Sequence, residues 1–143
     1  MVSKDCARAY RANSVLTATP GQLVLLLFEG ALNSMALARE AFDRPAEDLR
    51  RYEIINRQLS KARKIISELQ ATLDFNASGE FAGTMHRLYD YYNRRLLEAN
   101  LKKQVEPLAE VQRLLGELRD AWAEMLRTHP AAGSRTESGC LVA

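Results

Sequence analysis

The sequence predicts an all-α protein: an antiparallel, up-down four-helix bundle with an extended N-terminal segment and a disordered C-terminal tail. Pro and Gly are scarce between residues 22 and 127, and apolar residues recur there at spacings of three and four, which is the period of amphipathic helices. The predicted links between helices are short, and short links force consecutive helices to run antiparallel. We expect a flexible segment over residues 1–17, one bundle domain over 18–127 and a disordered tail over 128–143.

The first predicted helix begins with a complete set of start signals. Thr19 can cap the free N–H groups, Pro20 fits the first helical position, and Gln22 completes a capping box with Thr19. The helix is expected to end before Asp43. Its apolar seam consists of Val24, Phe28, Ala31, Met35, Ala38 and Phe42.

The second predicted helix runs from about Ala46 to Leu73. Its apolar residues alternate strictly at spacings of three and four, which is typical of helices that pack at shallow angles. The seam consists of Tyr52, Ile55, Leu59, Ala62, Ile66, Leu69 and Leu73.

The last two helices are predicted from near Ser78 and over roughly Val105 to Leu126. Ser78 is a favourable N-cap residue, and Pro107 is tolerated in a first turn, where the N–H groups have no partner within the helix. The third seam is Phe81, Met85, Leu88, Tyr92 and Ala99, and the fourth is Leu108, Val111, Leu115, Leu118, Trp122 and Met125.

The composition argues against several classes of function. The net charge is only +2, with acidic and basic residues interspersed along the chain, whereas nucleic-acid binding usually needs a concentrated basic face. The longest apolar run, Leu23 to Phe28, is too short to span a bilayer, and no signal peptide is evident. We expect a cytosolic protein with no direct membrane insertion.

The sequence also predicts no catalytic residue, no metal site and no cofactor. Neither His86 nor His129 follows a Glu three residues earlier, as a di-metal helical bundle would require, and no Gly-rich phosphate-binding loop precedes a helix. His86 is expected on the outer face of its helix, so a histidine phosphotransfer bundle is the alternative from another class. Such domains usually follow the histidine with Lys-Gly, whereas Arg87 and Leu88 follow it here.

Several apolar residues exceed what a single bundle core needs. Ile54 and Ile65 lie eleven residues apart on one flank of the second helix, and Tyr91 and Leu97 lie beside the third seam. Surplus apolar surface on a small protein usually indicates a partner, and outer apolar grooves suit amphipathic helices. We expect these four residues to line partner-binding grooves. Val15 and Leu16 of the N-terminal segment are expected to cover such a groove when the partner is absent.

An ordered series of motifs resembles the FliS family, the export chaperones of bacterial flagellin. The motifs are Thr17-Ala18-Thr19-Pro20, Leu27-Phe28-Glu29-Gly30-Ala31, Leu88-Tyr89-Asp90-Tyr91, Arg94-Arg95-Leu96-Leu97-Glu98-Ala99-Asn100 and Glu117-Leu118-Arg119-Asp120-Ala121-Trp122. There are two departures. Ser78-Gly79-Glu80 stands where the family usually has Gly-Gly-Glu, and Lys103-Gln104 stands where it usually has Asn-Asp, which removes a favourable N-cap.

The resemblance implies a specific function. Chaperones of this family bind the disordered C-terminal segment of flagellin, which becomes helical around the bundle; they prevent premature polymerisation and present the complex to the flagellar type III export gate. By the family pattern, Tyr10 matches a tyrosine implicated in partner binding. An alternative function is that of a helical adaptor for another flagellar client. The sequence also leaves open whether other flagellar regulators compete for the site and whether the free protein forms a weak homodimer.

Overall fold

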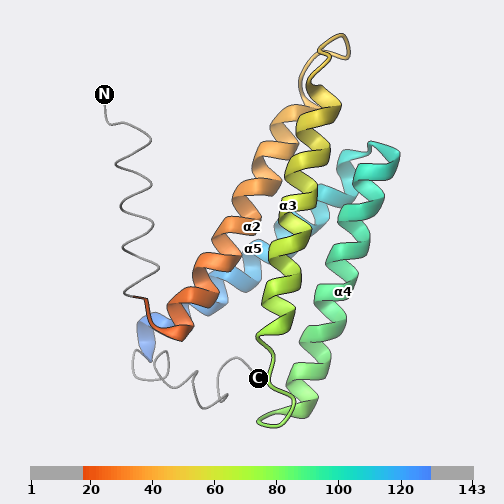
Figure 1. The fold of residues 1–143 in the computed structure, drawn as a ribbon. Helices are drawn as coiled ribbons and strands as arrows, with labels where there is room; N and C mark the ends of the chain where they lie inside the picture. The colour runs from red at the N-terminus through yellow and green to blue at the C-terminus, as the bar shows by residue number, and fades with distance from the viewer. Residues whose placement is uncertain (1–17, 130–143) are drawn as a thin grey trace, which may run out of the picture.

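The structure, a computed structural model, describes residues 18–129. In that range the chain forms four helices and no strand: α2 (Pro20–Phe42), α3 (Arg51–Ala71), α4 (Gly79–Lys102) and α5 (Val105–Thr128). Consecutive helices pack together and α5 returns against α2, so the four helices close into one bundle (Figure 1). The predicted all-α four-helix fold is confirmed.

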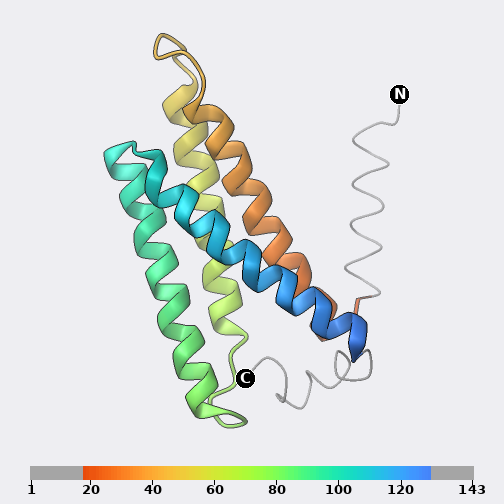
Figure 2. The same cartoon turned by 180° about the vertical axis from the view of Figure 1, so that it is seen from behind.

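The helices do not stay parallel along their whole length. Figure 2 shows α5 beginning beside the end of α4 and then crossing the bundle obliquely, so that its C-terminal half lies beside the start of α2. Along the stretch where α5 crosses toward α2, the N-terminal half of α4 remains beside the end of α3. The bundle is therefore closed where α4 ends and splayed where α4 begins.

The core consists largely of the predicted seams. The fully buried apolar residues include Ala31, Met35, Ala38, Ile55, Leu59, Ala62, Ile66, Leu69, Leu96, Ala99, Leu108, Val111 and Leu115. Two seam residues were predicted wrongly: Tyr52 is 57% exposed and Phe81 is 49% exposed. Each lies in the first turn of its helix, at one end of the bundle, so less of the neighbouring helices covers it.

The start of α2 confirms the predicted capping box. The backbone N–H of Gln22 donates to Thr19 Oγ1 over 3.2 Å, and the backbone N–H of Thr19 donates to Gln22 Oε1 over 3.0 Å. These bonds satisfy donors that would otherwise lack partners at a helix start. The helix ends at Phe42, immediately before Asp43, as predicted.

Helix α3 begins five residues later than predicted, at Arg51 instead of Ala46. Asp48 organises the intervening turn: its N–H donates to Pro45 O over 3.0 Å, and its Oδ1 accepts from the Arg50 N–H over 2.9 Å. The Arg50 bond, together with Arg44, lowers the pKa of the Asp48 carboxyl. A turn stabilised by its own side chain competes with an earlier helix start.

The remaining helix ends follow the prediction with small differences. Ser78 and Gln104 occupy the N-cap positions of α4 and α5, but neither side chain makes a capping hydrogen bond. Helix α5 continues to Thr128 instead of ending near Leu126, so the first residue of the predicted tail belongs to the helix. Lys103, which ends α4, adopts the left-handed conformation with φ 51°.

Candidate partner-binding surface

The outer side of the α2–α3 pair is an apolar surface, and two predicted groove residues lie on it. Ile54 and Ile65 are partly buried and pack against the core cluster. A Cβ built on Gly30 of α2 would lie 3.5 Å from Cδ1 of Ile65, an ordinary van der Waals distance, so Ile65 of α3 lies over Gly30. Leu23 and Leu37, at 38% and 39% exposure, extend the apolar surface along α2. We call these five residues the α2–α3 face.

A second group of apolar side chains lies at the splayed end of the bundle. Phe81 is half-exposed, and Met85 and Leu88 of α4 are partly buried beside the core. All three belong to the half of α4 from which α5 diverges (Figure 2). This end therefore presents apolar surface that a closed bundle would have covered.

Trp122 holds α5 against the start of α2 at this splayed end. Its Nε1–H donates to the Gly21 carbonyl over 2.8 Å, and its ring lies 6.4 Å from that of Phe28, centroid to centroid. Sequence periodicity assigned Trp122 to the core seam. The bond to Gly21 O joins residues 101 apart in the chain, so only the tertiary structure reveals it.

Tyr91, predicted to line a groove, connects α4 to α5 instead of lying on the α2–α3 face. Its hydroxyl donates to Glu110 Oε1 over 2.8 Å, and Arg95 Nε donates to the same oxygen over 2.7 Å. The Arg95 bond is the main cause that lowers the pKa of Glu110, and the bond to Glu110 raises the pKa of Tyr91. This polar cluster fixes α4 against α5 at the closed end, before the two helices diverge.

Leu97, the fourth predicted groove residue, lies on the side of α4 that faces α3. Its neighbours on that side are polar: Asn93 donates to Ser67 Oγ over 3.1 Å, and Asn100 donates to Asn56 Oδ1 over 2.8 Å. The structure therefore brings Ile54 and Ile65 together but places Tyr91 and Leu97 at two other helix contacts. Tyr10, Val15 and Leu16 lie outside the described residues.

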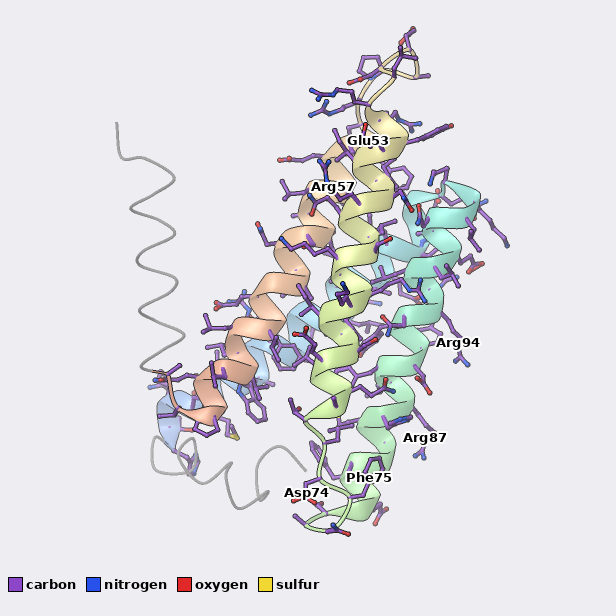
Figure 3. All side chains as sticks on the ribbon, viewed as in Figure 1. Glu53, Arg57, Asp74, Phe75, Arg87 and Arg94 are labelled. Carbon is purple, nitrogen blue, oxygen red and sulfur yellow. The ribbon has the colours of Figure 1, made fainter. Side chains whose placement is uncertain are left out.

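His86 belongs to a polar cluster near the link between α3 and α4. Its Nδ1 lies 3.7 Å from Asp90 Oδ2, and its ring meets Phe75 edge to face with a centroid distance of 5.9 Å. Gln70 Nε2 donates to both the His86 carbonyl and Asp90 Oδ1. Figure 3 labels Asp74 and Phe75 in this link. No group of three or more potential metal ligands occurs among residues 18–129.

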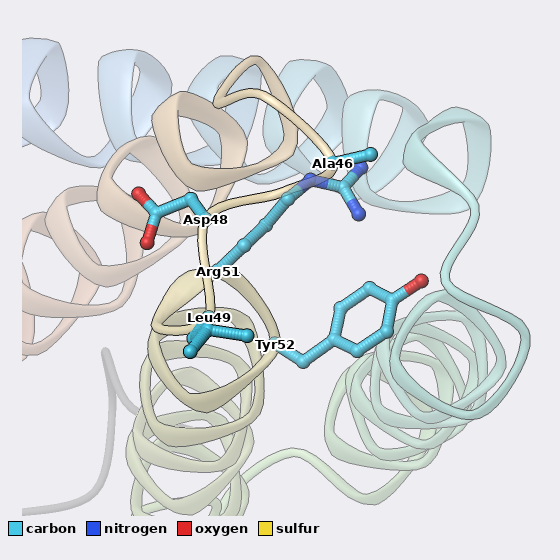
Figure 4. A pocket seen from close by; sticks show the side chains of 5 residues that line it. All are labelled: Ala46, Asp48, Leu49, Arg51 and Tyr52. Carbon is cyan, nitrogen blue, oxygen red and sulfur yellow. The ribbon is translucent and has the colours of Figure 1, made fainter.

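The closed end carries a small pocket of about 190 Å³ beside the α2–α3 turn (Figure 4). It is lined by Ala46, Asp48, Leu49, Arg51 and Tyr52. The Arg51 guanidinium lies 5.3 Å from the centre of the Tyr52 ring and donates to the Phe42 carbonyl over 3.2 Å. These contacts join the turn to α2 and α3. Interactions within the protein therefore explain the position of Arg51, and no bound ligand is needed to account for it.

By length and composition alone, one described helix, α2, could cross a membrane. The run Leu23 to Phe28 is short, but the complete helix of 23 residues passes that test. Its buried residues include Val24, Phe28 and Met35, which line the bundle core. Packing within the bundle thus accounts for the apolar character of the helix.

Leu37 and Gly30 belong to the surface but were not predicted from the sequence. Leu37 lies in the apolar run Met35 to Ala38 of α2, which covers every side of one helical turn. When a helix is apolar all round, its own periodicity does not separate core from surface. The available signal for Leu37 was the run Met35 to Ala38 itself, which is longer than a core stripe requires.

Comparison with known proteins gives one consistent family. The model of the family described as "Flagellar protein FliS" matches residues 3–129. The flagellar secretion chaperone FliS of Bacillus subtilis is 42% identical over 120 residues, which cover 84% of this chain and 85% of that protein. That of Salmonella typhimurium is 38% identical over 123 residues, covering 85% and 87%. The flagellar secretion chaperone FliSB of Pseudomonas aeruginosa is 39% identical over 108 residues, covering 76% and 82%. The chain belongs to the FliS family.

Proposed function

We propose that this protein is a cytosolic export chaperone for flagellin. It binds the disordered C-terminal segment of newly made flagellin, prevents its premature polymerisation and delivers it to the flagellar type III export gate. Three relatives that cover most of this chain are named flagellar secretion chaperones. The observation that carries the proposal is the apolar surface that the bundle leaves uncovered on α2 and α3 and at its splayed end.

The shape of that surface favours a helical client. The α2–α3 face extends along two antiparallel helices, with Ile65 of α3 lying over Gly30 of α2. Amphipathic helices bind such faces through apolar anchors spaced by whole turns. A client that is disordered when free must be ordered as it binds, and this cost offsets part of the interaction energy. Contact over both apolar areas would supply the extensive burial that such a client needs.

The proposal assigns no reaction to the protein. His86, the residue considered for phosphotransfer, lies close to Asp90 and against Phe75. These contacts give it a role in joining the α3–α4 link to α4. The chaperone would act by binding alone, without a nucleotide or another cofactor.

The test is titration calorimetry with a peptide of about 50 residues from the C-terminus of the same organism's flagellin, accompanied by circular dichroism of the mixture. We expect one-to-one binding and more helix in the mixture than in the separate components. A peptide of the same composition in scrambled order serves as the control. The proposal would be wrong if the native peptide released no heat and gained no helix.

A further inference from the structure

The helices divide the charged side chains unequally between two sides of the bundle. Helices α3 and α4 together carry nine Arg and Lys residues against five Asp and Glu, whereas α2 and α5 together carry four against seven. Because α3 packs on α4 and α2 packs on α5, the fold collects positive charge on one side and negative charge on the other. The net charge of +2 conceals this separation.

Six Arg and Lys residues of α3 and α4 make no ion pair within residues 18–129: Arg51, Lys61, Arg63, Lys64, Arg87 and Arg94. Arg51 instead donates to the Phe42 carbonyl. Lys61 lies seven residues after Ile54 and four before Ile65, on the flank of α3 that carries the α2–α3 face. On α5, by contrast, Arg113, Arg119 and Arg127 are each paired with a carboxylate. We call the other four residues, Arg63, Lys64, Arg87 and Arg94, the basic α3–α4 surface.

The acidic residues on this side compensate only part of the positive charge. Glu53 lies 3.7 Å from Arg57, and Asp90 lies 3.7 Å from His86. Glu68 is exposed on α3, and Glu80 is exposed in the first turn of α4, seven residues before Arg87.

The cations flank an uncharged polar seam. Arg87 and Arg94 are seven residues apart, and Figure 3 shows both pointing away from the bundle along one edge of α4. Lys64 is exposed on α3, and Arg63 is partly buried with no hydrogen-bond acceptor at its Nε. Between α3 and α4 lies the Ser67–Asn93 hydrogen bond of 3.1 Å. A partner on this surface would therefore meet hydrogen-bonding groups flanked by positive charges.

We propose that the basic α3–α4 surface docks an acidic surface of a protein partner, at a site separate from the apolar α2–α3 face. Unpaired cations on a rigid helical surface attract carboxylates from a distance, and such contacts mainly increase the association rate and select the partner. This binding is independent of the proposed client, since it uses different side chains. The protein would then hold an apolar client segment on the α2–α3 face while a second protein binds the basic α3–α4 surface.

Two other anionic partners fit the surface less well. Nucleic acid has a dense phosphate backbone, and here the acidic Asp90 lies between Arg87 and Arg94 on α4. A membrane surface would favour large apolar side chains among the cations. The exposed apolar residues Phe75 and Leu101 instead lie just before the start and near the end of α4.

The experiment measures binding of the full-length protein to poly-L-glutamate by fluorescence anisotropy of the labelled polymer at about 50 mM and about 300 mM salt. Vesicles with anionic lipid and a DNA duplex are measured in parallel. The test variant is Arg87→Glu/Arg94→Glu, and the control Arg113→Glu/Arg127→Glu changes the net charge equally on α5. Lys64→Glu/Arg94→Glu is a second test variant, and circular dichroism verifies that every variant is folded.

The proposal predicts that both test variants lose about tenfold or more in affinity for poly-L-glutamate, that the control changes by less than about twofold, and that higher salt weakens binding by the wild type. Equal losses in the test and control variants would overturn it, because net charge alone would then explain the attraction. It would also be overturned by the absence of wild-type binding. Tighter binding to the vesicles or to the DNA than to the acidic polypeptide would replace the protein partner with a membrane or a nucleic acid.

Discussion

Gly30 of α2 lies against Ile65 of α3, and a Cβ atom added to the glycine would lie 3.5 Å from the isoleucine Cδ1. That separation is an ordinary van der Waals contact, so one methyl group fits without displacing α3. A larger side chain would reach further toward Ile65 and fill the apolar face that we assign to the client. The pair thus relates the spacing of the two helices to the surface available on them.

Gly30→Ala should stabilise the protein. Alanine in a helix interior is favoured over glycine by about 0.5–1 kcal/mol, and the added methyl finds space beside Ile65. The measurement is the free energy of unfolding in urea. Gly116→Ala on α5, where an added Cβ meets nothing within 4 Å, is the matched control. A loss of stability in Gly30→Ala alone would show that the α2–α3 contact has no room for a methyl group.

Ile54→Ala and Ile65→Ala should each weaken client binding by about tenfold, because each removes an apolar anchor from the α2–α3 face. Both residues also pack against the core, so we expect each change to cost about 1–2 kcal/mol of stability, below the usual range for fully buried isoleucines. Calorimetry with the flagellin peptide measures the first effect and urea unfolding the second.

The control for these two variants is Leu101→Ala, since Leu101 is 73% exposed near the end of α4. Leu101→Ala should change neither the affinity for the flagellin peptide nor the free energy of unfolding. If the isoleucine variants bound the peptide as tightly as wild type, the α2–α3 face would not be the client surface, even if both proteins were less stable.

Glu110→Gln should make stability less dependent on pH in the acidic range. Bonds from Arg95 and Tyr91 lower the pKa of the folded-state Glu110 carboxyl below its ordinary value of 4.5. A carboxyl with a lowered pKa contributes stability above its unfolded pKa and loses it as pH falls through the folded value. The variant should therefore be less stable than wild type near pH 7, and the difference should shrink below about pH 4.5.

Thermal unfolding across that pH range checks this expectation. Tyr91→Phe removes one donor to the same oxygen and keeps Arg95, so its stability difference from wild type should be smaller but should follow the same pH trend. A difference between Glu110→Gln and wild type that stays constant down to low pH would show that the carboxylate charge has no part in joining α4 to α5.

Lys103→Gly should stabilise the link between α4 and α5. Lys103 ends α4 in the left-handed conformation, which costs a residue with a Cβ about 1 kcal/mol relative to glycine. Its Nζ contacts Asn100 Oδ1 at 2.6 Å and lies 5.5 Å from the centre of the Tyr52 ring, so the net gain should be somewhat less than that. Urea unfolding measures the change in the free energy of unfolding. The control Lys102→Gly, which changes a residue inside the helix, should destabilise the protein. A destabilised Lys103→Gly would mean that its side-chain contacts outweigh the backbone cost.

The sequence by itself determined the fold class and most helix ends. The capping box of Thr19 and Gln22 and the position of Ser78 before α4 are local features, formed by residues within one turn of one another. The seams of α3 and α5 predicted buried residues such as Ile55, Leu59 and Leu115, because helical periodicity identifies the side of a helix that is covered. The late start of α3 was missed because Asp48 stabilises a competing turn.

The tertiary structure decided which surplus apolar residues lie together. Ile54 and Ile65 share the α2–α3 face, whereas Tyr91 meets α5 and Leu97 faces α3. Periodicity gives a direction around one helix axis, but it specifies neither which helix lies in that direction nor where two helices diverge. The oblique path of α5 and the separation of charge between helix pairs follow from packing. They exist only once all four helices are in place.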